Sequence, residues 1–149
     1  MIKKRYKKVV IDASRNKSGG AIIYLKNFIK HLNIKNTEIK EIMIFSHENI
    51  LDQIPNRSFL IKRSHPLLEM NIFFQIIWQL IYLPFFLKKN DVDILYSTDS
   101  STFCNYSNSV VFNQDILSFD KQVLNQIPFS LEKIRLYIIK FLQIYSFNN

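Results

Sequence analysis

Residues 8–32 read KVVIDASRNKSGGAIIYLKNFIKHL, and this stretch decides the fold class. The β-branched run at residues 8–11 predicts a short strand, and the glycine pair Gly19 and Gly20 predicts a turn after it. Apolar residues then recur at helical spacing over residues 20–32, so an amphipathic helix follows the turn. A strand, a glycine turn and a helix in this order are typical of a parallel α/β sheet.

The rest of the chain continues this alternation. Further strands are predicted at residues 39–45, 59–62, 94–96 and 110–113. Helices are predicted at residues 48–54, at residues 69–88, and after Pro128, where Ser130 can cap a last helix. The sequence therefore predicts one Rossmann-like domain over residues 1–149, with a mainly parallel sheet and helices on both faces.

Composition and charge narrow the function classes. Cys104 is the only cysteine, which excludes a disulfide framework and a cysteine-built zinc site and predicts a cytoplasmic location. Residues 1–90 contain 16 basic and 6 acidic side chains, whereas residues 91–149 contain 4 and 6. The basic half suits an anionic membrane surface or a phosphate-bearing substrate, or it reflects AT-rich coding alone. Aromatic residues are not interleaved with these lysines as a stacking platform, so no nucleic-acid partner is expected.

The predicted helix at residues 69–88 is unusually apolar, because residues 70–87 contain no charge. Asn71, Gln75 and Gln79 recur every four positions and form one polar stripe, and Pro84 marks its far end. A membrane-spanning helix, a helix lying at a membrane surface and a helix packed on the sheet all remain open. The stripe favours packing on the sheet.

Small polar and charged residues follow three of the predicted strands. Because ligands bind outside the carboxyl ends of parallel strands, these residues are candidates for hydrogen-bonding the hydroxyls of a sugar. They are Asp12 and Arg15, then Ser97, Thr98 and Asp99, then Asn113, Gln114 and Asp115. The same residue types also cap helices and form turns, so a structural role stays open for each of them.

Gly19 and Gly20 are the only glycines in the chain. A glycine turn at a helix N-terminus lets the backbone approach an anion, so this pair is a candidate phosphate-binding loop, although a tight strand-to-helix turn remains the alternative. The segment lacks the GxGxxG and Walker A patterns, so neither a dinucleotide nor a P-loop nucleotide is expected as a cofactor. None of the three histidines has a second ligand at metal spacing, so no metal is predicted.

The order of these segments resembles the N-terminal domain of GT-B glycosyltransferases of family 4, the group 1 class. VVIDASRNKSGGAIIYLKNFI at residues 9–29 resembles the family's first strand, glycine loop and first helix. IIWQLIYLPFFLKKNDVDILYSTDSS at residues 76–101 resembles its helix, Leu-Pro break and fourth strand. VVFNQDILSFD, followed by SLEKIRLYIIKFLQIYSF, resembles a fifth strand that leads into a long helix with a mid-helix arginine, here Arg135.

The resemblance implies a retaining transfer of a sugar from a nucleotide-sugar donor to a glycan or lipid-linked acceptor in cell-envelope polysaccharide synthesis. It implies that Gly19 and Gly20 close near the donor phosphates. Many relatives have His-Asp where this chain has Gln114 and Asp115, so these two are expected to contact the sugar; Gln114 cannot titrate and therefore cannot transfer a proton.

The Glu-x7-Glu element of the family's donor-binding second domain does not occur in the 149 residues. The expectation is therefore an incomplete N-terminal half that is inactive alone, since both walls of a cleft must act together. Two further interpretations stay open: a non-catalytic α/β module that binds a sugar or phosphate, and a basic amphipathic protein of the inner membrane surface.

Overall fold

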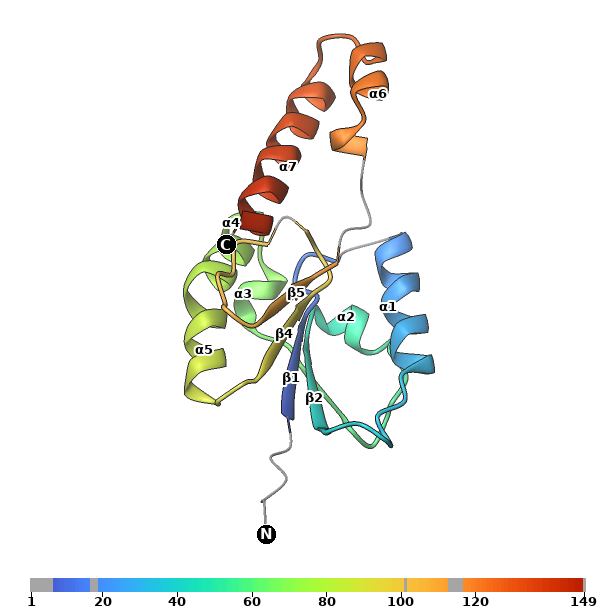
Figure 1. Ribbon diagram of the computed structural model, residues 1–149, viewed down its shortest axis with the longest axis vertical. Coiled ribbons are helices and arrows are strands. Elements are labelled where there is room, and N and C mark those ends of the chain that lie inside the picture. Colours follow the sequence, from blue (N-terminus) through green and yellow to red (C-terminus); the bar gives the residue numbers. More distant parts are fainter. Residues whose placement is uncertain (1–6, 17–18, 101, 113–116, 149) are drawn as a thin grey trace.

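The structure is a computed structural model that describes residues 7–16, 19–100, 102–112 and 117–148 (Figure 1). Five strands form one sheet in the order β3-β2-β1-β4-β5, and all neighbouring strands are parallel. They are β1 (Lys7–Asp12), β2 (Ile39–Phe45), β3 (Leu60–Arg63), β4 (Ile94–Ser97) and β5 (Ser109–Val111). This sheet confirms the predicted Rossmann-like α/β fold, and each predicted strand overlaps an observed one.

The helices follow the predicted alternation, with differences in their bounds. They are α1 (Gly20–His31), α2 (Glu48–Leu51), α3 (Pro66–Glu69), α4 (Ile72–Ile77), η1 (Trp78–Tyr82), α5 (Leu83–Lys89), η2 (Leu117–Phe119), α6 (Lys121–Gln126) and α7 (Leu131–Asn148). The α2 helix is shorter than the predicted residues 48–54, and the short α6 was not predicted. The predicted cap of α7 is confirmed, because the backbone N–H of Lys133 donates to Ser130 Oγ at 3.3 Å.

Helices cover both faces of the sheet because side chains alternate along the central strand β1. Val9 and Ile11 pack against α1, where they contact the cluster of Leu25 and Ile29. Val10 belongs to the opposite cluster, together with Trp78 of η1. Figure 1 shows α1 and α2 on one side of the sheet and α3, α4 and α5 on the other. Burial on both faces explains why β1 reads as a continuous apolar run.

The long apolar helix is not continuous over residues 69–88 as predicted. Asn71 starts α4 by accepting a hydrogen bond from the N–H of Phe73 at 3.1 Å, so α3 is a separate turn. The wide π-helical turn of η1 then joins α4 to α5. Pro84 lies in the first turn of α5 and the helix continues to Lys89, so proline does not end it. A wide turn directly before a proline accommodates its missing N–H group.

The strand order places a topological switch point between β1 and β4. From β1 the chain builds outward through β2 and β3, then returns to the other side of β1 to form β4 and β5. The loops that follow β1 and β4 therefore run to opposite sides and leave a crevice at the carboxyl ends of the strands. In Figure 1, α6 and α7 lie beyond this same edge of the sheet.

Candidate functional site

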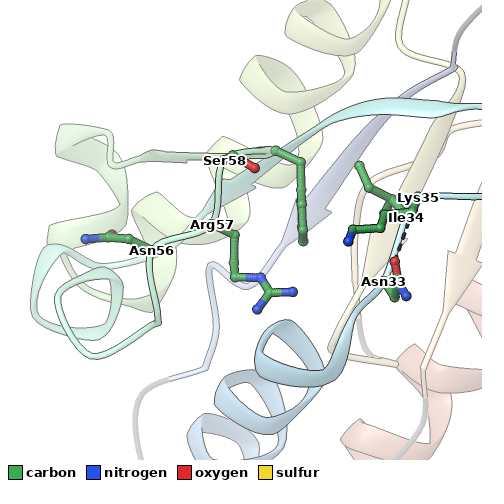
Figure 2. A pocket seen from close by; sticks show the side chains of 7 residues that line it. Asn33, Ile34, Lys35, Asn56, Arg57 and Ser58 are labelled. Atoms are coloured by element: carbon green, nitrogen blue, oxygen red, sulfur yellow. Dashed lines mark hydrogen bonds between the residues drawn. The ribbon is translucent and has the colours of Figure 1, made fainter.

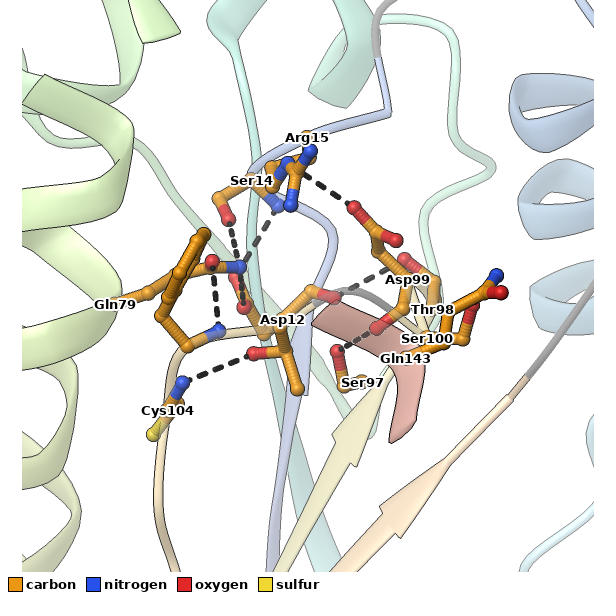
Figure 3. A network of polar contacts seen from close by, with 12 residues as sticks. Asp12, Ser14, Arg15, Gln79, Ser97, Thr98, Asp99, Ser100, Cys104 and Gln143 are labelled. Atoms are coloured by element: carbon orange, nitrogen blue, oxygen red, sulfur yellow. Dashed lines mark hydrogen bonds and ion pairs between the residues drawn. The ribbon is translucent and has the colours of Figure 1, made fainter. Parts of the chain in front are cut away.

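An ion pair bridges the switch point at the carboxyl edge of the sheet. Arg15, in the loop after β1, places its Nε 3.1 Å from Asp99 Oδ2, in the loop after β4 (Figure 3). The two side chains are 19% and 24% exposed, so solvent reaches both. The structure thus brings together one predicted residue from each of two strands that are distant in sequence.

Asp12 ends β1 and lies beneath this ion pair, with only 1% of its surface exposed. Its Oδ1 accepts a hydrogen bond from the N–H of Ser14 at 3.2 Å, and its Oδ2 accepts one from Gln79 Nε2 at 2.9 Å. Gln79 also donates to Ser14 Oγ at 3.2 Å and accepts from the N–H of Phe103 at 3.2 Å. Asp12 and Gln79 therefore join β1, η1 and the loop after β4 into one buried network (Figure 3).

Burial raises the pKa of Asp12 above its ordinary value of 3.8, and the nearby Asp99 adds to the increase. The hydrogen bonds from Ser14 and Gln79 act in the opposite direction, because they stabilise the charged carboxylate. Both carboxylate oxygens already accept hydrogen bonds. A sugar hydroxyl reaches Asp12 only if this network opens. In this arrangement Asp12 instead holds Ser14 and Gln79 in place at the carboxyl edge of the sheet.

Ser97 and Thr98 fix the loop that carries Asp99. Ser97 Oγ donates to the carbonyl oxygen of Asp99 at 3.0 Å. Thr98 donates from both its N–H and its hydroxyl to the carbonyl oxygen of Asp12, at 3.1 and 3.0 Å. Both side chains are buried. Their hydrogen bonds hold the loops after β1 and β4 in register, so Asp99 and Arg15 meet.

A glutamine of α7 extends the polar network toward the C-terminal helices. Gln143 Nε2 donates to Ser100 Oγ at 2.7 Å, and Gln143 Oε1 accepts from Ser118 Oγ at 2.7 Å. All three side chains are buried, so these bonds anchor α7 to the carboxyl edge of the sheet. Sequence reasoning missed Gln143, although a lone amide within the apolar run at residues 141–145 is a detectable signal.

The two glycines of the predicted donor-phosphate loop differ in backbone conformation. Gly19 has φ 67° and ψ −141°, a conformation that side chains with a Cβ rarely adopt, whereas Gly20 already belongs to α1. A Cβ at either position would meet nothing within 4 Å. The N-cap residue of α1 is Gly19, which has no side chain to cap the helix, and the first turn of α1 contains no acidic residue. These features fit an anion-facing helix N-terminus.

Three predicted residues, Asn113, Gln114 and Asp115, lie outside the described residues, so their role stays a prediction. Within the loop after β1, Asn16 is 4% exposed, and its Nδ2 has no hydrogen-bond partner among the residues that the structure describes. A buried amide without a partner is costly, so this group calls for an explanation. Asn16 was not among the predicted site residues.

A second polar cluster lies at the carboxyl ends of β2 and β3, and sequence reasoning missed it. His47 Nδ1 is 3.5 Å from Glu69 Oε2, while Glu69 Oε1 accepts from the N–H of Glu48 and from Ser64 Oγ, each at 2.8 Å. Burial alone would raise the pKa of Glu69, but these hydrogen bonds and the nearby His47 lower it below 4.5. The cluster ties α2 and α3 to the sheet edge.

A pocket of about 420 Å³ lies at the opposite edge of the sheet (Figure 2). It is formed by residues 33–35, before β2, and 56–59, before β3. The guanidinium of Arg57 donates to the carbonyl oxygen of Leu32 at 3.2 Å and lies over the ring of Phe59. It therefore holds together the two loops that line the pocket. Parallel sheets bind ligands at the carboxyl ends of their strands, so this pocket is not the candidate site despite its size.

Among the described residues, no group of three His, Cys, Asp or Glu side chains is arranged to hold a metal ion. Comparisons with protein-family models, with curated proteins and with solved structures find no match to this chain. Functional assignment therefore rests on the fold and on the geometry of the switch point.

Proposed function

We propose that this chain is the acceptor-side half of a glycosyltransferase that moves a sugar from a nucleotide-sugar donor to a glycan or lipid-linked acceptor. The observation that carries the proposal is the Arg15–Asp99 pair, which spans the switch point between β1 and β4. Open parallel sheets bind their ligands at this point. We place the reaction in cell-envelope polysaccharide synthesis, at the cytoplasmic face of the membrane.

The chemistry of this edge suits a polyhydroxylated ligand. A guanidinium offers five N–H donors in a fixed plane, and a carboxylate offers several acceptor positions, so together they match neighbouring sugar hydroxyls. Arg15 and Asp99 both keep solvent-accessible surface, whereas Asp12 beneath them is sealed. The partly exposed pair of Arg15 and Asp99 therefore contacts the sugar, and the buried network sets the position of that pair.

The donor phosphates are assigned to the turn at Gly19 and Gly20. The positive φ of Gly19 leads into the N-terminus of α1, where N–H groups and the helix dipole favour an anion. The Glu-x7-Glu pattern expected of a donor-binding domain does not occur in the sequence. Transfer by these 149 residues alone is therefore expected to be negligible.

A non-catalytic sugar- or phosphate-binding module is the second candidate. The burial of Asp12 favours it, because the carboxylate of β1 is engaged by Gln79 and Ser14 and its raised pKa reflects desolvation. An edge whose carboxylates are buried or ion-paired can bind a ligand without transferring a proton. Binding without turnover is the behaviour that this candidate requires.

Isothermal titration with UDP-glucose, GDP-mannose and a β-linked N-acetylglucosamine disaccharide tests ligand binding at the edge. We expect Arg15→Ala to weaken the tightest of these interactions at least tenfold. Arg57→Ala is the matched control, because Arg57 lies at the opposite edge of the sheet. Equal affinities for the two variants, or no binding of any probe, would contradict the assignment.

The coding sequence after Asn149 separates the two candidates. A reading frame that continues into a block with two glutamates eight positions apart would support the transferase, because donor binding requires such a domain in the proposal. Unrelated sequence at this place would favour the binding module.

A further inference from the structure

The pocket formed by residues 33–35 and 56–59 has a positively charged lining. Its volume is about 420 Å³, which is within the range of small-molecule sites. Two of its lining residues are cations, Lys35 and Arg57. The others that the structure describes are amide, hydroxyl or apolar side chains: Asn33, Ile34, Asn56, Ser58 and Phe59. No acidic side chain of this described lining therefore offsets the two cations.

The two cations reach the pocket from different loops. Lys35 precedes β2 and Arg57 precedes β3, and Figure 2 shows both side chains extending into the space between these loops. Both residues are exposed, so an ion from solvent reaches them without a rearrangement. Like charges on facing loops repel each other, and a pocket lined by one sign of charge concentrates ions of the opposite sign. The lining therefore favours an anion.

Hydrogen bonds hold both loops in place. Asn33 Oδ1 accepts from the backbone N–H of Lys35 at 3.1 Å. The carbonyl oxygen of Arg57 accepts from the N–H of Leu60 at 3.0 Å, at the start of β3. Loops that are already ordered lose little conformational freedom when a ligand binds, which lowers the cost of binding.

The negative groups near the pocket do not cancel its charge. The C-terminus of α1 lies beside it, where Arg57 donates to the carbonyl oxygen of Leu32 at 3.2 Å. A helix C-terminus carries about half a negative elementary charge, which is less than two cations supply. Glu38 is paired with Lys7 at 3.5 Å, and Asp52 is the C-cap residue of α2. Neither carboxylate lines the pocket.

We propose that this pocket binds a small phosphate monoester through Lys35 and Arg57. A phosphate monoester carries a charge of about −1.5 to −2 near pH 7, which matches two cations, whereas a single carboxylate leaves one of them unpaired. A guanidinium also binds two phosphate oxygens at once through parallel N–H groups. Arg57 uses Nη2 for Leu32, and its Cζ lies 5.4 Å from the ring centroid of Phe59, which supports the guanidinium plane.

This site is separate from the switch point. It lies before β2 and β3, whereas Arg15 and Asp99 follow β1 and β4 at the carboxyl edge of the sheet. A nucleotide-sugar has both of its phosphates esterified or bridged and carries no terminal monoester, so it is not the ligand of this pocket. The phosphate site and the proposed sugar transfer can therefore fail independently.

Titration of the ¹⁵N-labelled full chain with glycerol 3-phosphate tests the proposal. We expect the backbone amides of residues 33–35 and 56–59 to show the largest shifts. Acetate should bind about fivefold more weakly, because it leaves one exposed cation unpaired, and uncharged glycerol should cause no saturable shift. Raising NaCl from about 50 mM to about 500 mM should weaken the binding of glycerol 3-phosphate, because salt screens exposed charges.

Charge variants identify the residues that bind. Lys35→Gln and Arg57→Ala should each weaken the binding of glycerol 3-phosphate about fivefold, the scale expected for exposed charges. Lys88→Gln removes the same charge from the last turn of α5 and is the matched control. Arg15→Ala, at the switch point, should also bind like the wild type. Trp78 is the only tryptophan and is fully buried, so its unchanged fluorescence shows that each variant is folded.

The variant of Lys35 keeps the test decisive if Arg57→Ala loses stability. Arg57 bonds to the end of α1, whereas Lys35 contributes only its backbone N–H to the hydrogen bonds of the described residues. Equal affinities of Lys35→Gln and Lys88→Gln would overturn the proposal. So would acetate binding as tight as that of glycerol 3-phosphate, or shifts that leave residues 33–35 and 56–59 unaffected.

Discussion

Gln79 of η1 donates a hydrogen bond to Asp12 at the end of β1, at 2.9 Å and across 67 residues of sequence. This contact connects the central strand of the sheet to the helix that covers it, directly below the Arg15–Asp99 pair. It also turns the polar stripe of the α4–α5 segment toward the sheet. The candidate site and the orientation of the helix segment over residues 72–89 therefore depend on one buried amide.

Replacing Gln79 tests this role. Gln79→Leu keeps most of the volume but leaves Asp12 Oδ2, Ser14 Oγ and the N–H of Phe103 without their partner. Each lost partner of a buried group costs about 1–3 kcal/mol, and partial relaxation leaves an expected loss of about 3 kcal/mol in the free energy of unfolding. Urea unfolding measures it. Gln53→Leu, on the exposed side of the fold, should change stability by less than about 0.5 kcal/mol, and equal effects would contradict the account.

Asp12 gives the protein a specific pH dependence. Because burial raises its pKa above 3.8 in the folded state, the folded protein holds this proton when the unfolded chain has released it. The contribution of Asp12 to stability therefore falls as pH rises from 3.8 through the raised pKa. We predict that the stability of Asp12→Asn, relative to the wild type, improves as pH rises from 3.8 through the raised pKa of Asp12. An unchanged or opposite difference in urea titrations would show that the carboxylate is not desolvated.

Glu69 contributes in the opposite sense. Its pKa is lowered in the folded state, so its stabilisation is present above 4.5 and is lost as pH falls through the lowered value. Its side chain is 42% exposed, which limits the loss in Glu69→Gln to less than about 1 kcal/mol near neutral pH. The difference should disappear once pH falls below the lowered pKa of Glu69. Glu38→Gln, in an exposed pair with Lys7, is the matched control and should show no comparable change.

The two glycines should respond differently to substitution. Gly19→Ala forces a Cβ into a positive-φ conformation and should cost about 1–2 kcal/mol in stability. Gly20→Ala should be neutral or stabilising by up to about 1 kcal/mol, because Gly20 is helical and its surroundings are open. Thermal unfolding of the two variants measures both effects.

A valine at position 20 tests whether the turn contacts a ligand. If Gly20→Val weakens the binding of a nucleotide-sugar while leaving stability unchanged, the turn approaches the ligand. Unchanged binding would make the turn purely structural.

Cys104 should behave as an inert thiol. Burial, with a smaller effect of Asp12, raises its pKa to about 12, so almost no thiolate is present near neutral pH. A disulfide reagent such as DTNB should therefore not react with the native protein within minutes. One equivalent should react after unfolding in guanidinium, because Cys104 is the only cysteine. Rapid reaction in the native state would show that the cluster around Val10 and Trp78 is open.

The sequence predicts the sheet and much of the candidate site for physical reasons. The run at residues 8–11 is apolar because β1 is buried on both faces, and the glycine pair marks the positive φ at Gly19. Arg15 and Asp99 follow parallel strands, so a general rule about strand ends is enough to select both.

Other features depend on tertiary packing and could not be predicted from local pattern. The polar stripe was visible, but its inward direction follows from the contact between Gln79 and Asp12. The predicted helix at residues 69–88 runs past Pro84, but the π-helical turn of η1 that precedes this proline was not predicted. The α6 helix is six residues long and has too short an apolar pattern to be recognised.

Chemical-shift mapping tests the central claim, which is that ligands bind at the switch point between β1 and β4. The ¹⁵N-labelled chain would be titrated with a nucleotide-sugar and with the disaccharide, and the shifting backbone amides identified. We predict that the largest shifts fall on Arg15, Gly19, Gly20 and Asp99. Shifts confined to the pocket at residues 33–35 and 56–59, or no shifts with any probe, would contradict the account.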